Sequence, residues 1–191
     1  MKICLVRHGQ TDFNKLKLVQ GWADNPLNDT GIEQATNVGL FFKKNNYAFD
    51  HIYTSPLIRA KHTAELINRH LEQPKKIKID YHFLERDFAL FEGNNVDETI
   101  KIISKEGFNA KGYEDNKLLL KRIENGLLNL YKTHKDETVM ISCHSHVVKS
   151  FLILSDPEKY NYLTYLNNAS VHWLSFDGET LTIDQFNIEA N

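Results

Sequence analysis

The sequence predicts an α/β fold, a three-layer sandwich with a mostly parallel central sheet, helices on both faces and a C-terminal antiparallel hairpin. Short apolar runs at 3–6, 49–54 and 138–142 are typical of strands that are covered on both faces. Segments with helical periodicity separate these runs. Residues 171–176 and 179–186 alternate in polarity around an Asp-Gly dipeptide, which favours a tight hairpin turn.

The first helix is expected to begin at Thr30. Thr30 and Glu33 have the spacing of a capping box, and apolar residues follow at helical spacing: Ile32, Ala35, Val38 and Phe42. Lys43 and Lys44 would then lie at the negative end of the helix dipole.

The second helix is expected directly after the strand that ends at residue 54. Ser55 precedes Pro56, which is the order of an N-cap residue and a proline at the first helical position. The helix should cover 57–71 and end before Pro74.

Two further helices are expected in the second half of the chain. The first is a short helix over 95–107. The second covers 114–131 and has apolar side chains along one face: Leu119, Ile123, Leu127 and Leu130.

Length and composition indicate one domain over residues 1–191. Apolar residues make up 41% of the chain and charged residues 25%, as in globular proteins. A net charge of −2 provides no overall basic field, so neither nucleic acid nor a membrane is expected as a partner.

The two cysteines and the N-terminus point to the cytoplasm. Cys4 and Cys143 lie in apolar runs far apart in the sequence, which suits buried thiols in a reducing compartment. Arg7 and His8 interrupt the first apolar run before a signal-peptide core could form. A cytoplasmic location is therefore expected.

Charged and nucleophilic side chains collect at the predicted carboxyl edge of the sheet. Arg7 and His8 follow the first strand, His144 follows the strand over 138–142, and Arg59 lies near the start of the second helix. Two guanidinium groups and a helix N-terminus favour a phosphate, and a neutral imidazole is a nucleophile near pH 7. The residues predict a site for phosphoryl chemistry.

Short motifs cover nearly the whole chain in a fixed order: 5–14, 20–22, 26–31, 53–60, 84–88, 91–93, 141–144 and 168–171. In these segments the chain resembles the histidine phosphatase superfamily, also called the phosphoglycerate mutase-like family. The resemblance implies a phosphohistidine on His8, with Arg7, Arg59 and His144 around the phosphoryl oxygens. It implies Glu85 as the proton donor that later activates water.

Substrate contacts are expected from these residues and from four more: Asn14, Gln20, Gly21 and Ser145. The predicted activity is metal-independent hydrolysis of small phosphomonoesters, with a phosphorylated metabolite as the partner and no cofactor. A cap over the leaving group is expected at about 90–113, and the C-terminal hairpin would leave an edge through which two copies could form a homodimer.

Several alternatives stay open at this point. The first is a 2,3-bisphosphoglycerate-dependent phosphoglycerate mutase, because Arg86 resembles a mutase position. His8, His144 and His146 could instead bind a metal, and Asp87 or Glu92 could be the acid in place of Glu85. The last is a non-catalytic module that binds phosphorylated ligands. His146 and Lys149 depart from the family pattern, as do Ala89 and Phe91, and His146 bears most directly on the substrate range.

Overall fold

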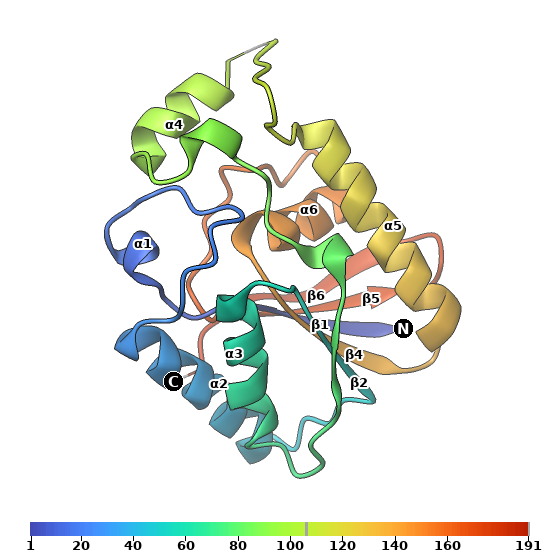
Figure 1. The fold of residues 1–191 in the computed structure, drawn as a ribbon. Helices are drawn as coiled ribbons and strands as arrows, with labels where there is room; N and C mark the ends of the chain where they lie inside the picture. The colour runs from blue at the N-terminus through green and yellow to red at the C-terminus, as the bar shows by residue number, and fades with distance from the viewer. Residues whose placement is uncertain (106, 191) are drawn as a thin grey trace.

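The computed structural model describes residues 1–105 and 107–190, and it contains one mixed sheet (Figure 1). The strand order is β3-β2-β4-β1-β5-β6, with β1 parallel to β4 and antiparallel to β5. The strands are β1 (Lys2–Arg7), β2 (His51–Thr54), β3 (Ile77–Ile79), β4 (Thr138–Cys143), β5 (Val171–Phe176) and β6 (Leu181–Ile188). The predicted α/β class, with a mostly parallel sheet and an antiparallel C-terminal pair, is confirmed.

Alternating side chains of β1 build a core on each face of the sheet. Ile3 and Leu5 pack with α5 (Asn116–His134) and α6 (Ser145–Ser155), whereas Cys4 and Val6 pack with α2 (Asp29–Lys44) and α3 (Ile58–Asn68). Because neighbouring residues of a strand point to opposite faces, one buried strand organises both layers. Figure 1 shows these helix pairs on either side of the sheet.

Short elements complete the fold around the carboxyl ends of the strands. They are α1 (Asp12–Lys15), η1 (Tyr81–Phe83), η2 (Ala89–Phe91) and α4 (Val96–Ile103). The helix expected over 95–107 is thus shorter than predicted, and residue 106 lies outside the described residues. Within the described residues, none of the helices combines the length and the apolar character that a membrane span requires.

The expected start of α2 was wrong by one residue, and its cap is a different side chain. The side chain of Asn28 accepts the N–H of Gly31 at 3.0 Å, so the helix begins at Asp29, and Thr30 and Glu33 form no capping box. The amide of Asn28 also donates to the Gln10 side chain at 3.1 Å. This second bond ties the cap to the loop after β1, a contact that sequence spacing does not reveal.

The expected N-cap of α3 was also wrong. The helix begins at Ile58 after Leu57, whose side chain makes no cap bond, and Pro56 lies before it. The exposed N–H of Ile58 instead donates to the carboxylate of Asp24 at 2.6 Å. A side chain from a distant loop therefore supplies the cap. The hydroxyl of Ser55 instead bonds to His144 in the site described below.

The last two strands are joined by a longer turn than predicted. Phe176 pairs with Leu181, so the turn has the four residues 177–180. The carboxylate of Asp177 accepts the N–H groups of Glu179 and Thr180 at 2.9 and 2.7 Å, which closes the turn without the two-residue geometry. Neither β3 nor α6 was predicted, because β3 has three residues and α6 is apolar over most of its surface.

Replacing Asn28 with Ala should destabilise the protein by about 1 kcal/mol, since the first turn of α2 loses its cap. Replacing the exposed Thr30 with Ala should change the free energy of unfolding by less than about 0.5 kcal/mol. Urea denaturation of both variants measures this directly. A larger loss of stability in Thr30→Ala than in Asn28→Ala would contradict this account and support the capping box of Thr30 and Glu33 that the sequence predicted.

Candidate active site

The carboxyl ends of β1, β2 and β4 bring three chain segments to one edge of the sheet. The N–H of His8 donates to the carbonyl of Cys143 at 2.9 Å, and the N–H of Ser55 donates to the carbonyl of Ser142 at 3.0 Å. His144 follows β4 as the N-cap residue of α6. The structure therefore places the imidazoles of His8 and His144 side by side, with ring centroids 5.2 Å apart.

His8 is buried, and the backbone of the next residue orients its ring. Nδ1 lies 2.7 Å from the carbonyl oxygen of Gly9, which can only accept, so Nδ1 carries the proton and Nε2 keeps its lone pair. Burial, and then the charges of Arg59 and Arg7, hold the pKa of His8 well below its usual value. A neutral ring with a nucleophilic Nε2 is therefore the state of His8 at pH 7.

Arg59 is fully buried near the start of α3, and backbone carbonyls of the loop at 20–23 bind its guanidinium group. Its terminal nitrogens donate to Ala23 and Gly21 at 2.8 and 2.7 Å. In the amide orientation that satisfies both of its polar atoms, Gln20 accepts Nε and Nη1 of Arg59 at 2.9 Å and donates to Thr11. Burial lowers the pKa of Arg59 to about 10, so the guanidinium stays charged at neutral pH.

Arg7 and His144 each keep a polar atom without a partner among the described residues. Arg7 donates to the carbonyl of Leu166 at 2.6 Å, but its buried Nε has no acceptor. His144 bonds through Nε2 to the hydroxyl of Ser55 at 2.7 Å, and its buried Nδ1 is unpartnered. Buried polar groups without partners are rare, so these atoms indicate a place for a ligand with hydrogen-bond acceptors.

Glu85 is buried close to these cations and faces α6. Its carboxylate accepts the N–H of Arg86 at 2.8 Å and the N–H of His146 at 3.3 Å, with Nδ1 of His146 at 3.7 Å. Burial acts to raise its pKa, but His146, His144 and the N–H of Arg86 outweigh that effect, so the pKa lies well below its usual value. Glu85 is therefore ionised in the unliganded protein. Burial lowers the pKa of His146 to about 4.

A cavity of about 570 Å³ opens over these groups. Arg7, His8 and Glu85 line it on one side, and α4 contributes Val96 and Ile100 on another. Arg59 and His144 do not line this cavity; their contacts place them behind the loop at 20–23 and at the base of α6. The cavity thus joins a polar end at His8 to an apolar wall from the segment expected to form a cap.

The four further residues expected to contact the substrate lie in different parts of the site. Asn14, Gln20 and Ser145 line the cavity, although the oxygen of Asn14 already accepts from Thr11 at 3.1 Å. Gly21 contributes its carbonyl to Arg59, and a Cβ at this position would lie 2.6 Å from a backbone oxygen. Gly21 therefore shapes the Arg59 binding loop and lies outside the cavity lining.

Sequence reasoning singled out His146, Lys149 and Arg86 one by one, but it did not bring them together at the far end of the cavity, and it missed Tyr162. His146 and Lys149 project from α6, and Tyr162 stacks on His146 with ring centroids 5.5 Å apart. Arg86 is buried under Tyr162, with its guanidinium carbon 4.3 Å from the ring centroid. The spacing of residues 146, 149 and 153 is helical, and it could have identified this face had α6 been predicted.

The alternative metal site of His8, His144 and His146 does not assemble in the described residues. The ligand atoms of these three histidines do not all lie within 4.8 Å of one another. Two guanidinium groups contribute to the low pKa of His8, which is an unfavourable setting for a cation.

A family model described as histidine phosphatase superfamily (branch 1) matches residues 3–189. The chain belongs to this superfamily. It is 35% identical to an uncharacterized phosphatase, PhoE, of Bacillus subtilis, over 99% of this chain and 95% of that protein. A 2,3-bisphosphoglycerate-dependent phosphoglycerate mutase of Borreliella burgdorferi is 36% identical over 63% of this chain, and the match spans only 45% of the mutase.

Solved histidine phosphatase structures have the same fold. A crystal structure of phosphoglycerate mutase from Bacillus anthracis superposes with a TM-score of 0.87 at 26% identity, covering 98% of this chain and 92% of the mutase chain. A phosphoserine phosphatase of Entamoeba histolytica in complex with 3-phosphoglyceric acid gives 0.84 at 29% identity, covering 98% and 96%. The resemblance seen in the sequence motifs is confirmed.

Proposed function

We propose that this histidine phosphatase hydrolyses small phosphomonoesters without a metal, through a phosphohistidine on His8. The observation that carries the proposal is the bond from Nδ1 of His8 to the carbonyl of Gly9, which leaves Nε2 as the nucleophile in a pocket of cations. A neutral nucleophile beside fixed positive charge suits attack on a phosphate anion.

In the first step the phosphoryl group is held by Arg7, which lines the cavity, and by Arg59 and His144, which the phosphate must reach behind the loop at 20–23 and at the base of α6. In this proposal the Ser55 hydroxyl, 2.7 Å away, donates to Nε2 of His144, and Nδ1 of that ring carries the proton and donates it to a phosphoryl oxygen. Nε2 of His8 forms the bond to phosphorus as the ester P–O bond breaks. The cations offset the charge on the equatorial oxygens during transfer.

Glu85 supplies the proton that the leaving oxygen needs. It is ionised before substrate arrives, but a phosphate dianion beside it raises its pKa, and a phosphate monoanion brings a proton of its own. In the second step Glu85 takes a proton from water, the water oxygen bonds to phosphorus and the P–Nε2 bond breaks. Phosphate leaves, and His8 returns to its neutral form.

The positive charges of Arg86 and Lys149 at the far end of the cavity favour substrates whose leaving group contains a second anionic group. The buried Arg86 donates to Tyr113 and Asn116 but keeps Nε unpartnered among the described residues. Burial lowers the pKa of Lys149 to about 8, so this amine is mostly charged at pH 7. A phosphorylated carboxylic acid would place its carboxylate there. The similar phosphoserine phosphatase of Entamoeba histolytica has been solved with one such acid, 3-phosphoglyceric acid.

The same cations favour one second candidate, the phosphoglycerate mutase. A mutase would convert 3-phosphoglycerate into its 2-phospho isomer in the presence of the bisphosphate, without net release of phosphate. We favour the phosphatase because this chain spans 95% of its phosphatase relative and only 45% of the mutase.

Replacing His8 with Ala should abolish turnover and leave the cationic pocket able to bind vanadate. Acid-labile phosphate should be trapped on the unmodified protein by rapid quenching and be absent from the variant. Residual turnover in His8→Ala, or label on another residue, would contradict the phosphohistidine. Vanadate binding without any turnover of the unmodified protein would instead favour a non-catalytic binding module.

Replacing Glu85 with Gln should slow hydrolysis of alkyl phosphates by about 10²–10⁴, since a poor leaving group needs the proton. With nitrophenyl phosphate the rate of the first step should fall much less. A burst of nitrophenol should appear, because without Glu85 to activate water the phosphoenzyme is hydrolysed slowly and accumulates. Pre-steady-state kinetics with both substrates measure the difference. Equal losses without a burst would show that Glu85 only positions substrate, and Glu92→Gln and Asp87→Asn would be measured next.

A further inference from the structure

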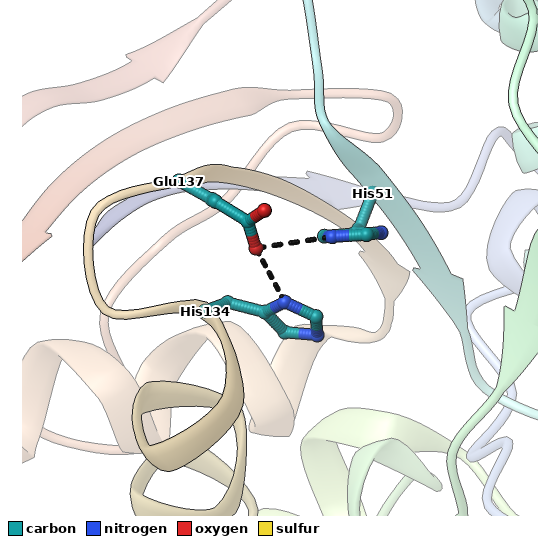
Figure 2. A group of neighbouring side chains, drawn as sticks. All are labelled: His51, His134 and Glu137. Carbon is teal, nitrogen blue, oxygen red and sulfur yellow. Dashed lines mark hydrogen bonds and ion pairs between the residues drawn. The ribbon is translucent and has the colours of Figure 1, made fainter.

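A cluster of two histidines and a glutamate, drawn in Figure 2, lies near the start of β2 and β4, whereas the catalytic histidines follow the ends of β1 and β4. His51 is the first residue of β2, His134 ends α5, and Glu137 precedes the first residue of β4. Since the catalytic histidines follow the carboxyl ends of β1 and β4, the length of a six-residue strand, about 20 Å, separates the two places.

The three side chains point toward one another. One carboxylate oxygen of Glu137 lies 2.6 Å from Nδ1 of His134 and 3.0 Å from Nε2 of His51. One ligand atom from each residue lies within 4.8 Å of the others. Ligand atoms around a tetrahedral Zn²⁺ are about 3.3 Å apart, so a small outward movement of the half-exposed Glu137 would make room for an ion.

Backbone contacts hold the cluster in place without a ligand. The N–H of Glu137 donates to the carbonyl of His134 at 3.1 Å, and the carbonyl of Glu137 accepts the N–H of Lys2 on β1 at 3.0 Å. His51 is paired with Val139 of β4. Three ligands from three separate elements are thus fixed by the sheet, which reduces the loss of chain freedom on binding.

A fourth residue, Tyr53, lies where it can orient the ring of His134. The hydroxyl of Tyr53 lies 2.9 Å from Nε2 of the buried His134. With a metal on Nδ1, Nε2 must carry the proton and donate it to this hydroxyl, which is how metal-bound imidazoles are usually oriented. Asp50 adds negative charge close by, since it precedes His51 and accepts the N–H of Thr138 at 2.8 Å.

We propose that His51, His134 and Glu137 form a binding site for a divalent transition metal, of which Zn²⁺ is the best match. Two imidazoles and one carboxylate are a common zinc ligand set, and water would fill the fourth position because His51 and Glu137 are partly exposed. The ion would join the end of α5 to β2 and β4. Its effect is on stability, because the catalytic residues lie at the other end of these strands.

The site is tested by titrating the metal-stripped protein with Zn²⁺ and with Co²⁺, whose visible absorption reports a four- or five-coordinate site. One equivalent should bind, and saturating Zn²⁺ should raise the Tm by about 5 °C or more. Glu137→Gln and His51→Ala should each weaken binding by more than about 100-fold, and Tyr53→Phe by about 10–100-fold. Thermal melts of the metal-free variants establish that they are folded.

His82→Ala is the matched control. His82 faces Asp80 at 2.8 Å as a histidine–carboxylate pair without a second histidine, so its removal should leave the affinity unchanged. No binding at millimolar metal would overturn the proposal. So would equal affinity in Glu137→Gln and His51→Ala, which would place the ion at other histidines, including the catalytic pair.

Discussion

The hydrogen bond between Nδ1 of His8 and the carbonyl of Gly9 is the interaction on which the proposed chemistry depends. It determines which ring nitrogen is free, and neighbouring elements fix both residues. The N–H of Gly9 donates to Thr63 on α3 at 3.1 Å, and the carbonyl of His8 accepts the N–H of Ala169 at 3.1 Å. A Cβ at Gly9 would lie 2.3 Å from the carbonyl oxygen of Gly31, so the loop packs directly on α2.

The proposed chemistry also depends on two buried guanidinium groups, those of Arg7 and Arg59, that have no carboxylate partner among the described residues. Arg59 is held by the carbonyls of Gly21 and Ala23, and Arg7 by that of Leu166, so each guanidinium is oriented without being neutralised. An unpartnered buried donor costs about 1–3 kcal/mol, and a phosphate would relieve that cost at Nε of Arg7 and Nδ1 of His144. Burial, together with the positive charge that attracts the phosphate, keeps His8 neutral.

The sequence predicted the parts of the site that depend on strand direction. His8 and His144 follow parallel neighbours in the sheet, so their meeting at one edge follows from topology. The contacts that depend on loops could not be predicted: Asp24 caps α3, and Gln20 orients Arg59. The far end of the cavity was not assembled from the sequence for a different reason, because α6, the largely apolar helix that carries His146 and Lys149, was not predicted.

The protonation state of His8 is the most direct test of this account, and nitrogen-15 NMR of histidine-labelled protein measures it, with His8→Ala to assign the signals. Burial, with the charges of Arg59 and Arg7, holds the pKa of His8 well below its usual value, which predicts a neutral ring with its proton on Nδ1 at pH 7 and at its ordinary pKa. Titration of His8 near its ordinary pKa, or a proton on Nε2, would contradict the account.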